Sequence, residues 1–156
     1  MSQTAINILI GGEAGQGLAT IGQLMSKALV RAGYEIHVAQ EYYSRIRGGH
    51  NTFSIRTGPE PIHAPTEDVD ILVALDNESL TLHADQLTER AVVIAAEGAD
   101  YDDGQVLKVP FSELAPKKIF HNVVALGVLG RTICKDIKVL EKLLQDTFGK
   151  KGDEVV

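Results

Sequence analysis

The chain has 156 residues, of which 44% are hydrophobic and 23% charged, so it is long enough for one domain with a buried core. Fifteen basic and twenty-one acidic side chains give a net charge of −6, which argues against a general binder of nucleic acid or anionic membranes. The single cysteine excludes an internal disulfide framework, and also an iron–sulfur or zinc site built from this chain's own thiolates. No apolar run reaches the roughly 20 residues of a membrane span, and the first residues lack the basic start of a secretory signal. We therefore expect one cytoplasmic domain over residues 1–156.

A glycine-rich stretch, Ile10 to Gly17, lies between an apolar run and a helical pattern. The apolar run, Ala5–Ile10, is typical of a strand buried on both faces. From Leu18 onward apolar residues recur every three or four positions, and Gly33 ends the expected helix. A strand, a glycine turn and a helix together present backbone N–H groups and a helix N-terminus to an anion, usually a phosphate.

Neither of the two common nucleotide motifs matches this stretch. A P-loop has Lys-Ser/Thr after its last glycine, where this chain has Leu18, so nucleotide hydrolysis is not expected. The glycine order Gly12-x-x-Gly15-x-Gly17 is the reverse of the Rossmann fingerprint, although Glu41, after the next strand, could act as its ribose-binding acid. A dinucleotide site therefore stays open as an alternative, as does a turn whose glycines only reverse the chain.

A second polar segment, Glu41–Asn51, follows the next expected strand. It contains Arg45, Arg47, two tyrosines, a Gly-Gly pair and His50. Arginine forks suit a phosphate or a carboxylate, and tyrosine faces suit a flat ring or a cation. The alternative is a solvated surface loop with incidental charge.

The rest of the chain alternates strands with helices. We expect further strands over Glu35–Ala39, Thr52–Thr57 (half exposed), Ile62–His63 (a short edge), Val69–Leu75, Ala91–Ala96 and Val106–Val109. We expect helices from the Asp76–Glu78 cap to Gln86, over Phe111–Ala115, over His121–Cys134 and after an Asp136 cap. This order predicts an α/β fold, a Rossmann-like three-layer open sheet that is mostly parallel, with helices on both faces. Ligands of such sheets lie beyond the carboxyl ends of the strands, where the glycine turn and the polar loop would both be.

The sequence shows no complete catalytic set. Cys134 lies in an apolar helical pattern and is expected to be a small core residue. The five histidines lack metal-ligand spacing, so we expect no metal site. No nucleophile and base are paired by sequence, which indicates a binding domain more than a complete enzyme. The last residues, Gly149 to Val156, look like the lead into another helix, so we also expect the domain to be truncated there.

The two loops together resemble a known family. Gly12-Glu13-Ala14-Gly15-Gln16-Gly17 with Thr20 and Gly22, and Ser44-Arg45-Ile46-Arg47-Gly48-Gly49-His50-Asn51, are similar to the gamma subunit or domain of the 2-oxoacid:ferredoxin (acceptor) oxidoreductases. Asp70–Asp76, and Asn122 with Ala125-Leu126-Gly127, extend the resemblance over nearly the whole chain. The motif Gly-Glu-Ala-Gly-Gln-Gly is most similar to that of gamma domains fused ahead of the alpha domain.

The resemblance implies an enzyme that oxidatively decarboxylates a 2-oxoacid, such as pyruvate or 2-oxoglutarate, to acyl-CoA. Thiamine diphosphate with Mg would lie on alpha and beta chains, and iron–sulfur clusters on a ferredoxin-like chain or ferredoxin. This chain would contribute subunit assembly and coenzyme A binding, would be inactive alone, and could form a homodimer in isolation. A free-standing dinucleotide-binding protein and a purely structural gamma domain remain the alternatives. The cofactor-binding residues implied are Gly12, Gly15, Gln16, Gly17, Thr20, Tyr43, Arg45, Arg47, Gly48, Gly49, Asn51 and Asn122.

Overall fold

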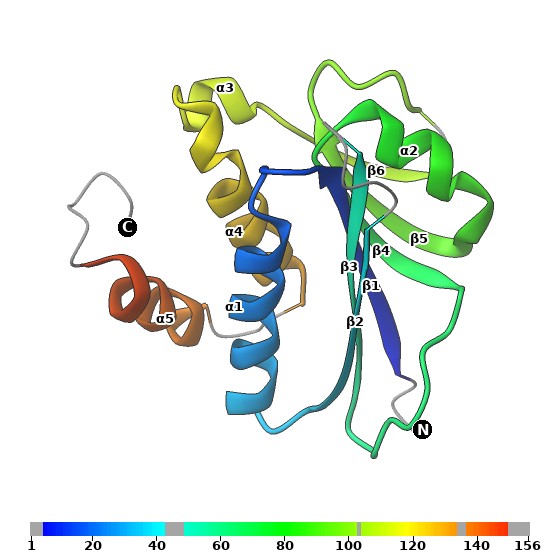
Figure 1. The fold of residues 1–156 in the computed structure, drawn as a ribbon, viewed down its shortest axis with the longest axis vertical. Coiled ribbons are helices and arrows are strands. Elements are labelled where there is room, and N and C mark those ends of the chain that lie inside the picture. Colours follow the sequence, from blue (N-terminus) through cyan, green and yellow to red (C-terminus); the bar gives the residue numbers. More distant parts are fainter. Residues whose placement is uncertain (1–4, 43–48, 103, 134–136, 150–156) are drawn as a thin grey trace.

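The computed structural model describes residues 5–42, 49–102, 104–133 and 137–149, which form a six-stranded sheet flanked by helices (Figure 1). The strands are β1 (Ile6–Glu13), β2 (Glu35–Tyr42), β3 (His50–Gly58), β4 (Val69–Ala74), β5 (Leu87–Ala96) and β6 (Gln105–Val109). The α-helices are α1 (Leu18–Arg31), α2 (Asn77–His83), α3 (Phe111–Leu114), α4 (His121–Ile133) and α5 (Lys138–Phe148), with short 3-10 helices at Ala84–Gln86 and Lys118–Phe120.

The strand order is β2-β3-β1-β4-β5-β6. β1, β4, β5 and β6 are parallel, whereas β3 runs antiparallel to both of its neighbours, β1 and β2. The predicted open α/β sheet is confirmed. It is mostly parallel, and its two antiparallel pairs are both made by β3. The cause is the short connection between β2 and β3, because parallel neighbours need a crossover of about a dozen residues or more.

Helices cover the two faces of the sheet unequally. α1, α4 and α5 lie on one side and α2 on the other (Figure 1). Ile8 and Ile10 of β1 point into the larger core under α1, α4 and α5, and Leu9 points into the smaller core under α2. Gly22 lets α1 approach β3, because a Cβ there would overlap the Phe53 ring. The larger core therefore fixes where α1 begins, next to the end of β1.

Two details of the expected strands are wrong. The segment at Ile62–His63 forms no strand. β3 is not half exposed, because it lies between β1 and β2, and Phe53 and Ile55 are buried. Its polar side chains lie on the other face of β3. There His50 meets His83 of α2, and the loop at 59–68 supplies contacts such as the Arg56 Nη1 bond to the Ala64 oxygen, 2.9 Å.

The helix-cap predictions have mixed outcomes. Asp76 caps α2, since its Oδ1 accepts a hydrogen bond from the Ser79 backbone N–H at 2.8 Å. α5 has Ile137 at its N-cap position with no side-chain cap bond. Asp136 and Cys134 lie outside the described residues. In the described part of the chain, no helix is long and apolar enough to cross a membrane.

Candidate functional site

The glycine turn begins later than its sequence indicates. β1 continues through Gly12 to Glu13, so the turn itself is Glu13 to Gly17. Gln16 closes this turn twice: its backbone N–H donates to the Glu13 oxygen at 3.1 Å, and its side-chain Oε1 accepts from the Glu13 N–H at 2.7 Å. Gln16 is a predicted cofactor-binding residue. Its side-chain amide oxygen is therefore engaged in holding the turn.

The turn leads directly into the N-terminus of α1. Gly17 is the N-cap, in a left-handed conformation with φ 76°, and no side chain caps the helix. The first helical bonds run from Thr20 and Ile21 to the Gly17 oxygen, at 3.0 and 3.3 Å. The N–H groups of Leu18 and Ala19 precede them and have no intrahelical acceptor. Since the first turn contains no acidic residue, this helix end is suited to an anion.

The β2–β3 hairpin brings the end of the second loop to the same place. Gly12 is opposite Asn51 in the sheet register, and the Ala14 N–H donates to the Gly49 oxygen at 3.2 Å. The structure therefore places Gly49 and Asn51 beside the turn. Four further predicted residues of this loop lie outside the described residues: Tyr43, Arg45, Arg47 and Gly48. Their predicted contacts stay predictions.

A cleft of about 260 Å³ lies between the turn, α1 and the hairpin. Three predicted residues line it, Gly15, Gly17 and Asn51. The other described residues of the predicted set do not line it: Gly12, Gln16, Thr20, Gly49 and Asn122. The other lining residues are Leu18, Ala19, Gln40, Tyr42, Thr52 and Phe53.

One asparagine side chain, that of Asn51, lines the cleft, and a second lies beside it against Gly17. Asn122, from the first turn of α4, lies so close to Gly17 that a Cβ on Gly17 would overlap its Nδ2. The Oδ1 atoms of Asn51 and Asn122 are buried and make no hydrogen bond within the described residues. Buried acceptors are nearly always paired in folded proteins, so these two are suited to N–H or O–H donors of a ligand.

Glu41 does not occupy the position of a ribose-binding acid. It lies within β2, and β3 separates that strand from β1. Its neighbours Gln40 and Tyr42 line the cleft. Because side chains alternate along a strand, Glu41 points to the opposite face of the sheet. The geometry therefore weakens the dinucleotide alternative.

A buried histidine pair beside the site was not anticipated. The Nε2 atoms of His50 and His83 are 2.8 Å apart, and His83 Nδ1 lies 2.6 Å from Gln86 Oε1. Because that oxygen only accepts, His83 donates to it through Nδ1 and accepts from His50 through Nε2. Burial, and then the nearby His83, lower the pKa of His50, against a smaller opposing effect of Asp76 and Glu78. Spacing could not reveal this pair, because the two histidines come from β3 and α2.

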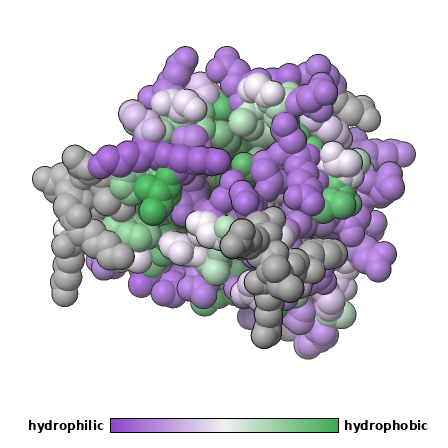
Figure 2. Space-filling model, turned by 45° about the horizontal axis from the view of Figure 1, so that its top comes forward, coloured by the Kyte–Doolittle hydropathy of each residue, from purple (hydrophilic) through white to green (hydrophobic). Residues whose placement is uncertain are grey.

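The surface around the site is mainly hydrophilic. Figure 2 brings this edge of the sheet forward and shows mostly hydrophilic side chains with apolar ones between them. Within the described ranges, no three His, Cys, Asp or Glu side chains are grouped so that they could hold a metal ion.

An open α/β sheet with an anion-suited helix end beside a hairpin defines a ligand-binding domain. The model of the pyruvate ferredoxin/flavodoxin oxidoreductase family matches residues 7–156, and the chain belongs to that family. It is 26% identical over 160 residues to the 2-oxoglutarate synthase subunit KorC of Archaeoglobus fulgidus, covering 96% of this chain and 82% of that protein. It is 39% identical over 75 residues to the alpha subunit of a 2-oxoacid:ferredoxin oxidoreductase from a Sulfolobus species, covering 48% of this chain and 12% of that protein.

Two solved structures are also similar. The 2-oxoglutarate:ferredoxin oxidoreductase of Magnetococcus marinus, solved with 2-oxoglutarate, coenzyme A and succinyl-CoA bound, matches 97% of this chain with a TM-score of 0.85 and 26% identity. Pyruvate oxidoreductase subunit PORC of Thermotoga maritima shares the fold, with a TM-score of 0.76, 22% identity, and coverage of 99% of this chain and 89% of that one. The chain spans only 28% of the Magnetococcus chain and 12% of the Sulfolobus subunit.

Proposed function

We propose that this chain is the gamma domain of a 2-oxoacid:ferredoxin or other acceptor oxidoreductase, and that its cleft contributes to binding coenzyme A. The observation that carries the proposal is the meeting of the Glu13–Gly17 turn, the N-terminus of α1 and the β2–β3 hairpin in one cleft. The Magnetococcus relative, which has coenzyme A bound, supports the choice of ligand.

The residues present suit coenzyme A. The N–H groups of Leu18 and Ala19 can donate to a phosphate oxygen at the positive end of α1. The Oδ1 atoms of Asn51 and Asn122 can accept from the amide or hydroxyl groups of the pantetheine arm. When bound, coenzyme A supplies the thiol that receives the acyl group.

The cleft provides only part of a binding site. Its volume of about 260 Å³ is below the roughly 300–1,000 Å³ of pockets that enclose a small ligand. The remaining contacts would come from alpha and beta chains, which would also hold thiamine diphosphate and Mg. Iron–sulfur clusters would lie on a ferredoxin-like partner. We place Arg45 and Arg47 at the border between coenzyme A and those chains, and the assembly in the cytoplasm.

The proposal is tested with Asn51→Ala and Asn122→Ala in the assembled enzyme. Each removes an acceptor for a ligand donor, worth about 1 to 1.5 kcal/mol, so the KM for coenzyme A should rise about five- to tenfold. The KM for the 2-oxoacid should stay unchanged, because its site lies on other chains.

Asn77→Ala is the matched control, because Asn77 is exposed on α2, away from the cleft. It should leave both KM values unchanged. Unaltered coenzyme A kinetics in both cleft variants would contradict the role of this cleft.

Two alternatives have distinct signatures. A dinucleotide-binding protein would bind NAD(H) or FAD at micromolar concentration, which a titration of the purified chain measures. A purely structural gamma domain would keep its coenzyme A kinetics in the asparagine variants but lose assembly when the Arg47 loop is altered.

A further inference from the structure

The two edges of the sheet differ in how they are protected. β6 has five residues, and its Lys108 forms an ion pair with Asp102. Short length and charge are the usual means by which an edge strand avoids pairing with another chain. β2 has eight residues and pairs with β3 along its whole length without a register shift. It contains no proline and no lysine, and its charged residues, Glu35 and Glu41, lie near its two ends. β2 is therefore the longer of the two edges and the one with an uncharged middle.

The outer side of β2 offers both backbone groups and apolar surface. In an antiparallel pair, alternate residues turn their N–H and C=O groups away from the partner strand. Among the described residues, no strand pairs with this outer side. Val38 and Tyr42, on the face toward α1, are 38% and 63% exposed, and Tyr34 just before the strand is also exposed. Such an edge is a template for a further strand.

We propose that β2 pairs antiparallel with β2 of a second copy of this chain, across a twofold axis at Ala39. Opposite residues of an antiparallel pair lie on the same face, so only registers that match like faces are allowed. Centring on Ala39 sets Ile36 opposite Tyr42 and Val38 opposite Gln40 toward α1. On the other face, His37 is opposite Glu41. Every contact occurs twice, as a twofold interface requires.

The charges and lengths of the paired segments favour this register over the two registers centred on Val38 and Gln40. Centring on Val38 would set Glu35 opposite Glu41, a like-charge pair that is destabilising. Centring on Gln40 would leave Ile36 and His37 without opposite residues in β2. The Ala39 register instead sets Glu41 opposite His37, without a like-charge pair, and places the smallest side chain of the strand on the axis.

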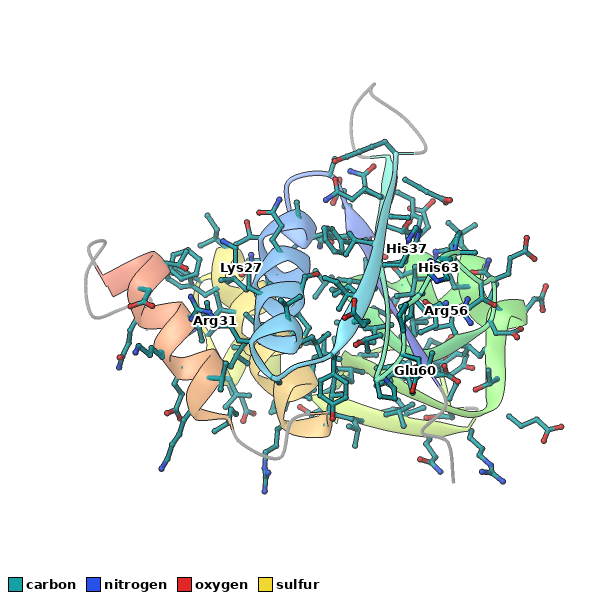
Figure 3. All side chains as sticks on the ribbon, turned by 90° about the horizontal axis from the view of Figure 1, so that it is seen from below. Lys27, Arg31, His37, Arg56, Glu60 and His63 are labelled. Atoms are coloured by element: carbon teal, nitrogen blue, oxygen red, sulfur yellow. The ribbon has the colours of Figure 1, made fainter. Side chains whose placement is uncertain are left out.

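Among the described residues, polar side chains gather on one face of this edge. Figure 3 shows His37, Arg56 and His63 gathered on the side of β2 and β3 away from α1, where no helix covers the sheet. The second copy would bring its Glu41 to this side. Because the strands are antiparallel, the two clefts would lie at opposite ends of the joined sheet. Gln40 and Tyr42 belong both to this edge and to the lining of the cleft.

Cysteine cross-linking of the full-length protein tests both the pairing and its register, in a Cys134→Ser background. Opposite residues have Cα atoms about 4.5 to 5.5 Å apart, within the range that a disulfide spans. Under mild oxidation Ala39→Cys should therefore give a covalent dimer. Val38→Cys and Gln40→Cys are the controls, because each would lie diagonal to its own copy. They should give about tenfold less dimer, since Cα atoms beyond about 7 Å are not bridged without backbone movement.

A second variant measures the same interface without a cross-link. Ala39→Glu would set two carboxylates opposite each other beside Glu41, so the copies of this chain per particle should fall from two to one in native mass spectrometry. Ala84→Glu, an exposed alanine after α2, should keep two copies. The proposal is overturned by one copy per wild-type particle, by cross-linking at Val38 in place of Ala39, or by a disulfide from Ala39→Cys to a different polypeptide.

Discussion

The two halves of the sheet hold different kinds of cleft at the same edge. In the parallel half, a hollow of about 290 Å³ beyond β4, β5 and β6 is lined by Leu75, Val109 and Phe111, among others, and by His121. The Nε2 atom of His121 is 3.1 Å from the Ala115 oxygen, and its ring stacks on Phe111. In the antiparallel half, the cleft between the glycine turn and the hairpin is lined by Asn51, and Asn122 of α4 lies beside it against Gly17. The Oδ1 atoms of both are buried without partners in the described residues.

This difference indicates that the parallel half serves mainly as scaffold and that the antiparallel half holds the candidate site. The carboxyl ends of parallel strands supply a crevice in any such fold. Here the chemistry suited to a ligand comes from the part that departs from the parallel pattern, where β3 returns beside β1. If so, the two halves should respond differently to mutation.

The largest effect is expected from the core of the parallel half. Leu72 of β4 is fully buried in the smaller core, so Leu72→Ala should lower the free energy of unfolding by about 3 kcal/mol. Urea unfolding of the full-length protein measures it. The KM of the assembled enzyme for coenzyme A should stay within about twofold of wild type, because distant sites act independently. A large rise in that KM would show that the two halves are not separate.

The next effect is expected at the junction of turn and helix. Gly17→Ala combines a left-handed backbone with overlap of Asn122, and should cost about 2 kcal/mol of stability. It should also raise the KM for coenzyme A about tenfold, because it displaces both Asn122 and the end of α1. Gly33→Ala is the matched control: Gly33 also has positive φ, at 88°, but a Cβ there meets nothing within 4 Å. It should lose stability and keep the KM. Equal KM values in the two variants would contradict the role of the turn.

Sequence patterns predicted the scaffold well because local rules determine it. The period of the apolar residues located α1 and the buried strands, and Asp76 was recognisable as a cap. The antiparallel course of β3 and the burial of Phe53 depend on which strands become neighbours, and no local pattern encodes that choice.

For the site, the sequence predicted that the glycine turn and the loop ending at Asn51 lie together at the carboxyl edge of the sheet. Asn122 was predicted as a binding residue only from the family resemblance. The bracing role of Gln16 and the His50–His83 pair were missed. The histidine pair depends on side chains that meet only after the sheet has formed. The Gln16 bond is local, but the glycine pattern does not indicate which side chain closes the turn. Glu41 was expected just after the second strand, whereas it lies within β2, which continues to Tyr42.

A smaller effect is expected from the second loop of the antiparallel half. Arg47→Ala should raise the KM for coenzyme A about fivefold, which corresponds to the loss of roughly 1 kcal/mol if the guanidinium makes one charge-assisted bond to the ligand. Weakened assembly, seen by size-exclusion chromatography, is the other expected result. Arg90→Ala is the control, since Arg90 is exposed in β5. Unchanged KM and assembly in Arg47→Ala would remove this loop from the site.

The smallest effect is expected from the histidine pair that links the two halves. The pKa of His50 is lowered from its ordinary 6.5, so between the lowered value and 6.5 the unfolded chain binds more protons than the folded one. Stability should therefore fall as the pH falls through this window, and His50→Gln should reduce the fall. Urea unfolding at about pH 7 and 5.5 measures it. His63→Gln, at an exposed histidine, should behave as wild type. The same pH dependence in all three proteins would contradict the assignment to His50.

The central claim is that coenzyme A binds at the antiparallel half. Hydrogen–deuterium exchange of the assembled enzyme, with and without coenzyme A, tests this most directly. We expect slower exchange in peptides covering Glu13–Thr20, where the N–H groups of Leu18 and Ala19 have no intrahelical acceptor, and unchanged exchange across β5 and β6. Protection of β5 and β6, with none at the glycine turn, would contradict it.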